Sequence, residues 1–333
     1  MPGNGDPATM SAIVQDAYGT AAGQVLRLAR VGRPAIGDDD VLVRVAAASV
    51  DRGTWHVMAG TPYAIRIAGF GVRAPNSSNP GRALAGTVES VGKDVTGLEP
   101  GDEVYGTCDG SFAEYASARA KKLARKPANL SFEQAAAAPI SGVTAFQALR
   151  KANVQPGQKV LVIGASGGVG TFAVQIAKAW GAEVAGVCST TKMDLVRSLG
   201  ADHVIDYTRD DFTAGNQRYD VVLDIGGNRR LSHLRRILTP RGTLVIIGGE
   251  EGGRWLGGLD RSVRAVVLSL FVRQTLVMLV STENSKDLNA LRDLIETAQI
   301  APAIDRTYPL SETPDAIEYM SENRARGKVV ITV

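Results

Sequence analysis

One stretch of the chain, residues 159–189, limits the possible folds more than any other feature of the sequence. It reads KVLVIGASGGVGTFAVQIAKAWGAEVAGVCS, with an apolar run, a glycine-rich turn, apolar residues at helical spacing and a second apolar run. Short runs of branched apolar residues are typical of strands buried on both faces of a parallel sheet. We therefore predict a strand, a glycine turn, a helix and a second strand, the βαβ unit of a doubly wound α/β sheet.

The glycines Gly164, Gly167 and Gly170 are three residues apart, and the predicted helix begins among them. The start of a helix directs unpaired backbone N–H groups and the positive end of the helix dipole at one point, which favours an anion such as a pyrophosphate. The pattern predicts a dinucleotide site, with Ala165 in place of the first glycine of the G-x-G-x-x-G motif.

The same residues allow a second interpretation. Residues 164–168 also match the G-x-S-x-G nucleophile elbow of α/β-hydrolases, in which Ser166 would be the nucleophile. That chemistry needs a histidine later in the chain, and only His203 and His233 follow. We favour the dinucleotide site because a strand, a helix and a second strand surround the turn.

The residues after the second strand indicate which dinucleotide binds. NAD-binding units usually have Asp or Glu there, about 20 residues past the glycines, to bind the ribose hydroxyls. This chain has Cys188, Ser189, Thr190, Thr191 and Lys192. Hydroxyls and an ammonium group bind a phosphate, and no carboxylate repels it, so we predict NADP(H) as the cofactor. The alternative for Lys192 is a solvated lysine in the first turn of a helix.

The composition argues against several other classes of protein. The chain of 333 residues is long enough for two domains, and its net charge of +3 is too small to indicate binding to nucleic acid. Its two cysteines cannot form a disulfide framework or a four-cysteine zinc site, which favours a cytoplasmic protein. No apolar signal-peptide core begins the chain, and Arg264 and Arg273 interrupt its longest apolar region, so no membrane span is expected.

Strand and turn signals dominate the chain up to about Asn129, and helical signals follow from Ser131. The first part predicts an all-β domain, a distorted barrel, with strands at residues 11–14, 24–29, 41–48, 83–91, 102–106 and 112–116. The SFEQ sequence at Ser131 has the form of a capping box. A last strand, residues 329–333, has no obvious place in the nucleotide sheet and could return to the first domain.

Five motifs, in order along the chain, match one known family. They are GDEVYGTCDGSFAEYASA (101–118), AAAAPISGVTAFQAL (135–149), VLVIGASGGVGTFAVQIAK (160–178), LGADHVIDY (199–207) and GKVVITV (327–333). Over almost its full length the chain resembles the medium-chain dehydrogenase/reductase superfamily, and within it the zinc-independent, quinone-oxidoreductase-like branch.

This resemblance implies a GroES-like β-barrel catalytic domain, residues 10–130 with 300–333, beside a Rossmann NADP-binding domain, residues 131–299. Residues 1–9 would be a flexible N-terminus, and the active site would lie in the cleft between the domains. A homodimer is also implied, joined by an edge strand at residues 275–281.

The resemblance also assigns the cofactor contacts. The pyrophosphate turn of the family is matched by Ser166, Gly167, Gly168 and Val169. The adenosine-phosphate pocket of its NADP-dependent members is matched by Ser189, Lys192 and Tyr207. A position near the nicotinamide is matched by Thr144, and strands that flank the cofactor end at Gly226 and Gly248.

Two departures from the zinc alcohol dehydrogenases imply that no metal is bound. Asp51 stands where those enzymes have a cysteine ligand, and Arg82 stands where they have a histidine ligand. Without zinc to polarise a carbonyl, reduction of a quinone or a conjugated carbonyl is expected in place of alcohol oxidation.

The candidate catalytic residues are Asp51, Trp55 and His56. Quinone-oxidoreductase relatives often have tyrosine, and some have lysine, at the position of His56, and imidazole suits proton transfer near neutral pH. His56 would protonate the developing enolate, or would only shape the pocket. Asp51 could bind a hydroxyl of the nicotinamide ribose or of the substrate. Trp55 could form an apolar wall with Tyr63 and Phe70, and residues 265–271 could close over the nicotinamide or form a dimer contact.

These expectations predict a zinc-independent, NADPH-dependent oxidoreductase that transfers hydride to a quinone or an α,β-unsaturated carbonyl. Two alternatives stay open. One is a non-catalytic NADPH-binding sensor or partner protein, and the other is an alcohol dehydrogenase of the same superfamily.

Overall fold

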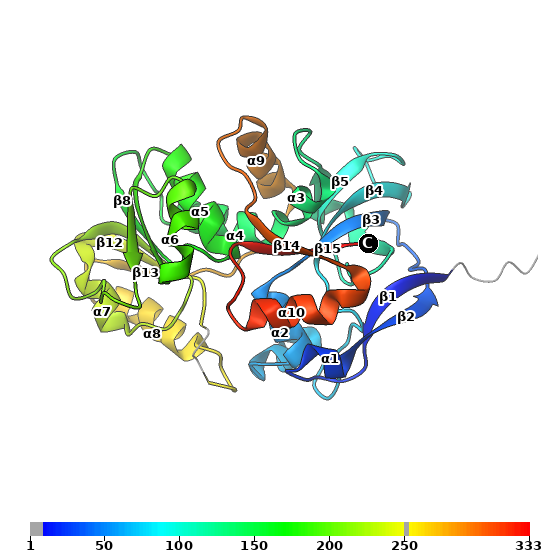
Figure 1. The fold of residues 1–333 in the computed structure, drawn as a ribbon, viewed down its shortest axis with the longest axis horizontal. Coiled ribbons are helices and arrows are strands. Elements are labelled where there is room, and N and C mark those ends of the chain that lie inside the picture. Colours follow the sequence, from blue (N-terminus) through cyan, green and yellow to red (C-terminus); the bar gives the residue numbers. More distant parts are fainter. Residues whose placement is uncertain (1–8, 250–252) are drawn as a thin grey trace, which may run out of the picture.

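The structure is a computed structural model that describes residues 9–249 and 253–333, and its two halves lie side by side (Figure 1). Each half is built on its own large sheet. Residues 1–8 of the predicted flexible N-terminus lie outside the described residues. Its last member, Thr9, is the first residue of a strand.

A parallel sheet of six strands forms the first half, in the order β10-β9-β8-β11-β12-β13. The strands are β8 (Lys159–Ile163), β9 (Glu183–Cys188), β10 (His203–Asp206), β11 (Tyr219–Asp224), β12 (Leu238–Ile246) and β13 (Thr275–Met278). The strand order reverses between β8 and β11, and ligands of such sheets bind at the carboxyl ends of the strands beside a reversal. The predicted doubly wound sheet is confirmed, and the glycine turn lies at this point.

Helices pack on both faces of the parallel sheet. They are α5 (Gly168–Ala179), α6 (Met193–Ser198), α7 (Leu231–Arg236) and α8 (Leu259–Ser269), with a short turn η3 (Thr190–Lys192). Successive side chains of a strand point to opposite faces. Val160 and Val162 accordingly join the apolar core that contains residues of α5, whereas Leu161 and Ile163 join the core that contains residues of α7 and α8.

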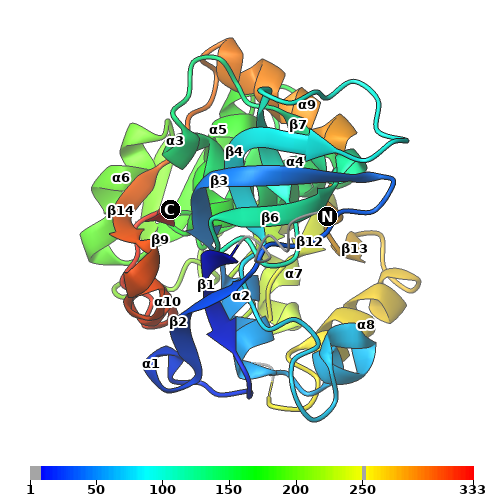
Figure 2. The ribbon, with the colours of Figure 1, turned by 90° about the vertical axis from the view of Figure 1, so that its right-hand side faces the viewer.

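A mostly antiparallel sheet forms the second half, in the order β14-β15-β3-β4-β5-β7, with β6 also paired to β3. Figure 2 shows β3, β4 and β6 of this sheet side by side. The strands are β3 (Asp40–Val50), β4 (Ala83–Val91), β5 (Glu103–Thr107), β6 (Tyr115–Arg119), β7 (Leu123–Arg125), β14 (Ile304–Pro309) and β15 (Lys328–Thr332). A separate pair consists of β1 (Thr9–Gln15) and β2 (Leu26–Gly32). Since β15 pairs antiparallel with β3, the C-terminal strand returns to the first part of the chain, as the sequence suggested.

The shorter helical elements of this half are α1 (Ala22–Val25), α2 (Arg52–Ala59), α10 (Thr313–Ser321) and the turns η1 (Arg66–Phe70), η2 (Ala120–Lys122) and η4 (Leu310–Glu312). Two predicted strands differ from the observed ones. Residues 22–25 form α1, which packs against α10, so β2 begins only at Leu26. Phe112 is fully buried and its carbonyl accepts from the N–H of Ile13, so β6 begins three residues later than predicted.

Two helices join the halves. They are α3 (Phe132–Ala136) and α4 (Pro139–Lys151), and the predicted capping box of α3 is present at Ser131 and Gln134. α4 packs against α5 and also contacts β4 and β5. The largest apolar core therefore contains residues of both halves, such as Tyr105 of β5 and Phe172 of α5.

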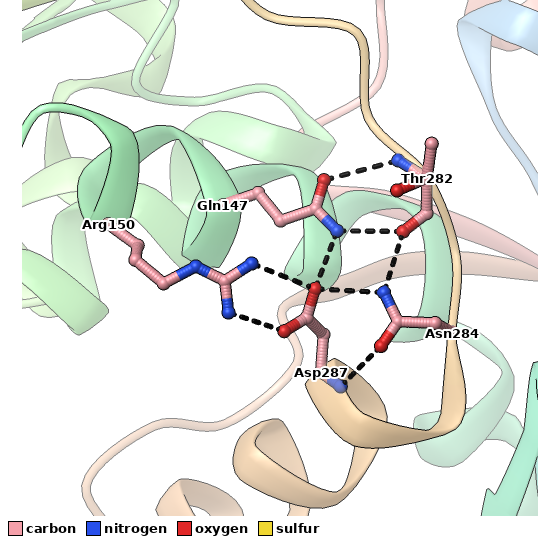
Figure 3. A network of polar contacts seen from close by, with 5 residues as sticks. All are labelled: Gln147, Arg150, Thr282, Asn284 and Asp287. Carbon is pink, nitrogen blue, oxygen red and sulfur yellow. Dashed lines mark hydrogen bonds and ion pairs between the residues drawn. The ribbon is translucent and has the colours of Figure 1, made fainter.

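A polar network fixes α9 (Ser285–Glu296) against α4 (Figure 3). The carboxylate of Asp287 is 2% exposed and accepts hydrogen bonds from Arg150 at 2.6 and 3.1 Å, from Gln147 at 2.7 Å and from Asn284 at 3.0 Å. Burial alone would raise the pKa of Asp287, but these hydrogen bonds hold that pKa below its ordinary value. α9, which follows β13 in the chain, is thus attached to α4.

Candidate active site

Backbone hydrogen bonds to the neighbouring strand fix the glycine turn after β8. The N–H groups of Gly164 and Ala165 both donate to the carbonyl of Val187, at 3.1 and 3.0 Å. Gly164 has a φ of 87°, a left-handed conformation that favours glycine. α5 then begins at Gly168, with Gly167 as its N-cap. The N–H groups of its first turn have no acceptor within the helix, so the turn suits an anion.

The turn is closely packed on one side and open on the other. A Cβ atom on Gly170 would lie 2.1 Å from the carbonyl oxygen of Gly164. The methyl group of Ala165 is fully buried, 3.0 Å from the Cβ position of Gly186, which explains why a small residue replaces the first glycine of the motif. A Cβ atom on Gly167 would meet nothing closer than 3.5 Å. A ligand can therefore approach the backbone at Gly167, and the turn fits the pyrophosphate of a dinucleotide.

Ser166 lies in this turn and is 7% exposed. Its carbonyl accepts a hydrogen bond of 2.9 Å from the N–H of Gly327, so the turn is attached to the start of β15. His203 begins β10, at the opposite end of the parallel sheet, where its ring lies 3.4 Å from Glu183. The hydrolase interpretation therefore gains no support from the position of His203.

The residues expected at the adenosine end of the cofactor come together. Ser189 and Tyr207 follow β9 and β10, which are neighbours in the sheet, and the N–H of Tyr207 donates to the carbonyl of Cys188 at 3.1 Å. Tyr207 is 50% exposed. Its ring is thus available to a ligand beside the end of β9.

Lys192 is directed at the loop between α10 and β15. Its Nζ atom donates to the carbonyls of Asn323 and Ala325, both at 2.7 Å. Burial lowers the pKa of Lys192. Arg52 of α2 also binds this loop. It donates to the carbonyl of Ser321 at 3.2 Å and to the side chain of Asn323 at 2.6 Å. Lys192 is therefore not a simple solvated lysine.

An acidic residue that the sequence did not indicate lies at this end of the site. Asp206 ends β10, is 4% exposed and accepts hydrogen bonds from the hydroxyls of Thr190 and Thr208. These hydrogen bonds hold the pKa of Asp206 below its ordinary value. Thr190 is thus already engaged, which leaves Ser189 and Thr191 as the other hydroxyl groups in the segment after β9.

Asp51 occupies a buried polar cluster at the end of β3. Its carboxylate accepts hydrogen bonds from Lys328 and, at 2.9 Å, from the hydroxyl of Ser141, and the hydroxyl of Ser49 lies 3.5 Å from it. Asp51 is 8% exposed and Lys328 is 2% exposed. Lys328 was not predicted as a site residue. It lies in the apolar strand motif GKVVITV, where only the presence of a lysine in an apolar strand could have indicated a buried charge.

His56 lies on α2, next to Trp55. Its Nδ1 atom is 2.8 Å from the carbonyl oxygen of Thr61, so the neutral ring carries its proton on Nδ1. The rings of Trp55 and His56 meet edge to face, with centroids 5.3 Å apart. Trp55 also packs against the apolar core that contains Met58 and Leu310.

Tyr63 has a partner that the sequence did not indicate. Its ring meets that of Trp255 edge to face at 5.3 Å, and its N–H donates to the carbonyl of Arg254 at 2.8 Å. The chain after α2 therefore contacts the segment before α8, which belongs to the other half of the molecule. This contact connects Tyr63 to the residues that lead into 265–271.

The remaining predicted cofactor residues lie on α4 and after β11 and β12. Thr144 is 8% exposed and stands three residues after Ser141, on the same face of α4. A Cβ atom on Gly226 would meet nothing closer than 3.9 Å, whereas one on Gly248 would lie 1.9 Å from the carbonyl oxygen of Ile225. Gly226 therefore borders open space, and Gly248 is required by packing.

A buried ion pair that the sequence did not indicate lies at the carboxyl ends of the parallel strands. Asp224 ends β11, is fully buried and pairs with Arg261 of α8. Burial raises the pKa of Asp224, although Arg261 opposes that shift. The pair anchors α8 at the carboxyl ends of the strands.

Comparison with known proteins identifies the family. Models for an alcohol dehydrogenase GroES-like domain and for a zinc-binding dehydrogenase match residues 37–128 and 199–331. A 2-methylene-furan-3-one reductase from Solanum lycopersicum is 35% identical, over 98% of this chain and 79% of its own. The chloroplastic NADPH-dependent alkenal/one oxidoreductase of Arabidopsis thaliana is 34% identical, over 98% of this chain and 80% of its own. The solved structure of the quinone oxidoreductase from Coxiella burnetii matches with a TM-score of 0.86 at 28% identity, covering 98% of this chain and 100% of that one.

The chain belongs to the medium-chain dehydrogenase/reductase superfamily. The predicted fold class, a GroES-like domain with a Rossmann domain, is thereby confirmed. So are the predictions of an oxidoreductase and of a nicotinamide cofactor.

One matching model of this superfamily is described as a zinc-binding dehydrogenase, but the residues at the expected zinc positions do not fit a cation. Asp51 is neutralised by the ammonium group of Lys328, and the guanidinium group of Arg82 lies 3.5 Å from Glu283. Within residues 9–249 and 253–333, no group of three or more His, Cys, Asp or Glu side chains is placed to hold a metal ion.

The cavity that opens beside α9 is separate from this site. It has a volume of about 530 Å³ and lies between the barrel and α9, lined among others by Arg119, Arg125 and Arg292. These arginines already pair with acidic neighbours, at 3.3 Å for Arg119, 2.6 Å for Arg125 and 3.5 Å for Arg292.

Among the described residues, no helix is both long and apolar enough to cross a bilayer.

Proposed function

We propose that this protein is a zinc-independent, NADPH-dependent oxidoreductase that transfers hydride to a quinone or an α,β-unsaturated carbonyl. The observation that carries the proposal is the buried pair of Asp51 and Lys328, because an ammonium group engages the residue at an expected zinc-ligand position, beside an intact dinucleotide turn. The names of relatives support the substrate class, since they include an alkenal/one oxidoreductase and quinone oxidoreductases.

Lys192, Ser189 and Tyr207 favour NADPH over NADH. Ser189 and Tyr207 directly follow β9 and β10, and Lys192 ends the turn η3 after β9, where the 2′-phosphate of the cofactor would be recognised. A phosphate there would accept a charge-assisted hydrogen bond from Lys192, whose ammonium group is now held by two carbonyls. Asp206, the nearby acid, is occupied by Thr190 and Thr208.

His56 is the candidate proton donor. NADPH, when bound, supplies the hydride, and the oxygen of the reduced quinone or enone then needs a proton. Because the carbonyl of Thr61 accepts the Nδ1 proton, the doubly protonated ring would give its proton from Nε2. Trp55 fixes the ring by its edge-to-face contact.

We also propose the domain limits 10–130 with 300–333 and 131–299, and a homodimer. β13 is an edge strand of the parallel sheet, and α8 next to it exposes Val263 and Val267, followed by the exposed C-cap residue Leu270. An unpaired edge beside an apolar helix face suits a second copy of the chain.

A cytoplasmic location stays a prediction, because relatives include chloroplastic and mitochondrial proteins.

The test is NADPH oxidation with a panel of quinones, enals and enones, measured with and without a strong chelator. We expect turnover that prefers NADPH and does not change with the chelator. NADPH binding without turnover of any acceptor would favour the non-catalytic sensor. Alcohol oxidation that the chelator abolishes would favour the alcohol dehydrogenase.

A further inference from the structure

Three segments that are far apart in the sequence meet beneath the glycine turn. They are the end of β3, the start of α4 and the start of β15, which contribute Asp51, Ser141 and Lys328. The Nζ atom of Lys328 donates to the carboxylate of Asp51, to the carbonyl of Val50 at 3.1 Å and to the hydroxyl of Ser141 at 3.3 Å. An ammonium group has three protons, so all of them are engaged.

We propose that the ion pair of Asp51 and Lys328 is a positioning device for hydride and proton transfer. It fixes the position of α2, and therefore of His56, relative to the glycine turn that would bind the cofactor. This inference rests on the proposed function, because it assigns a role within the same cleft. The protons of Lys328 are engaged, and Oδ1 of Asp51 accepts from both Lys328 and Ser141, so the pair acts through the elements that it joins.

One end of the device is the glycine turn. Lys328 follows Gly327, whose N–H donates to the carbonyl of Ser166 at 2.9 Å. A Cβ atom on Gly168 would lie 3.0 Å from Cδ of Lys328 and 2.9 Å from the hydroxyl oxygen of Ser141. The side chains of the cluster therefore pack directly against the first residue of α5, and any displacement of Lys328 is transmitted to the turn.

The other end of the device is α2. Asp51 is the N-cap residue of α2, but its side chain makes no capping hydrogen bond and turns instead to Lys328 and Ser141. Arg52, the first residue of α2, holds the loop before Lys328 by its bond to Asn323. α2 is thus bonded at two successive residues to the segment 323–328, which is itself bonded to the glycine turn through Gly327, and His56 lies four residues further along α2.

The role of an ion pair can be tested because its effect on stability can be separated from its effect on geometry. Removal of one partner leaves an uncompensated buried charge, whereas replacement of both by neutral residues of similar size is often harmless to stability. The matched variants are Lys328→Met, Asp51→Asn and the double variant Asp51→Asn/Lys328→Met. Arg150→Met is the control, because it breaks another ion pair to a buried carboxylate, in the network beside α9 (Figure 3).

The experiment measures melting temperature, kcat, KM and the isotope effect with NADPH deuterated at the transferred hydrogen. We expect the double variant to recover the melting temperature of the wild type but to keep a kcat lowered by about tenfold or more, with a larger isotope effect. Arg150→Met should lower the melting temperature and leave the isotope effect unchanged. A double variant with the kcat and isotope effect of the wild type would overturn the proposal, even if both single variants fail to fold.

If the wild type reduces no quinone or enone, the proposed function fails, and the positioning role is then tested without turnover. Hydrogen exchange of the NADPH-bound protein should show faster exchange in residues 52–59 and 166–171 together in the double variant, and in neither segment in Arg150→Met. Unchanged exchange in either segment of the double variant would overturn the positioning role on its own.

Discussion

The cofactor turn and the proposed acceptor side of the site are built in different ways. The turn comes from one continuous βαβ unit, and its shape depends on backbone contacts such as those of Gly164 and Ala165 to Val187. The acceptor side that we propose consists of residues 52–72 and residues 253–271, which come from two distant parts of the chain. It is also the more exposed of the two, since Ile67 is 81% exposed and Phe271 is 80% exposed.

This difference shows which part of the chemistry a local sequence can encode. A turn formed by backbone atoms tolerates few side chains, so its glycines are visible in the sequence and its ligand follows from them. A wall formed by side chains of several segments depends on how those segments pack. The cofactor is therefore specified locally, and the acceptor is specified by tertiary structure.

Gly170→Ala should have the largest effect, because it breaks the cofactor side. The added Cβ atom would lie 2.1 Å from the backbone oxygen of Gly164, so the first turn of α5 must move. We expect a loss of about 1–3 kcal/mol in stability and a fall in turnover of about 100-fold. Thermal unfolding measures the stability, steady-state oxidation of NADPH measures the turnover, and fluorescence titration with NADPH measures the affinity. Gly32→Ala is the control, since a Cβ atom there has no neighbour within 4 Å. Affinity and stability equal to the wild type would contradict the packing of the turn.

His56→Phe should break the acceptor side alone. Loss of a general acid lowers kcat by about 100-fold, while NADPH affinity should stay as in the wild type because His56 is not part of the turn. His56→Tyr, which keeps a proton donor, should retain more activity than His56→Phe. Steady-state kinetics over a range of pH provides the measurement. Full turnover of His56→Phe with the pH profile of the wild type would show that His56 only shapes the pocket.

Lys192→Ala sharpens the comparison at the adenosine end. Loss of one charge-assisted hydrogen bond should lower the preference for NADPH over NADH by about tenfold, whereas Lys192→Arg should keep it. The ratio of kcat/KM for the two cofactors measures the effect. If both values fall equally, Lys192 only holds the loop that contains Asn323 and Ala325.

Much of the fold could be predicted because its signals are local. The glycine turn, the capping box at Ser131 and the parallel strands each depend on a few neighbouring residues. α2 was missed because its eight residues contain Gly53 and its N-cap residue makes no capping bond. That side chain is engaged elsewhere, by a partner that local patterns do not reveal.

The parts of the site that escaped prediction are pairs between distant residues. Asp51 and Lys328 are 277 residues apart, and Asp224 and Arg261 are 37 residues apart. Each of these residues is unremarkable in its own segment, and a buried charge becomes visible only when its partner is known. The contact of Tyr63 with Trp255 is of the same kind. Such pairs depend on sheet topology, which a single sequence indicates only in outline.

Asp287→Asn should have the smallest effect on turnover, because Asp287 lies neither in the glycine turn nor on the proposed acceptor side. The variant keeps the shape of the network in Figure 3 but removes the charge that pairs with Arg150. We expect the free energy of unfolding at neutral pH to fall by on the order of 2 kcal/mol. Because the folded pKa of Asp287 lies below its ordinary value of 3.8, its ionised form stabilises the protein above that value, and this contribution is lost as the pH falls through the lowered folded pKa. Urea unfolding from about pH 7 to about pH 3 should therefore show the difference between variant and wild type shrinking towards the acid end. A difference that stays constant with pH would mean that the carboxylate is not stabilised by its hydrogen bonds, and a change in cofactor preference would mean that α9 is coupled to the cleft.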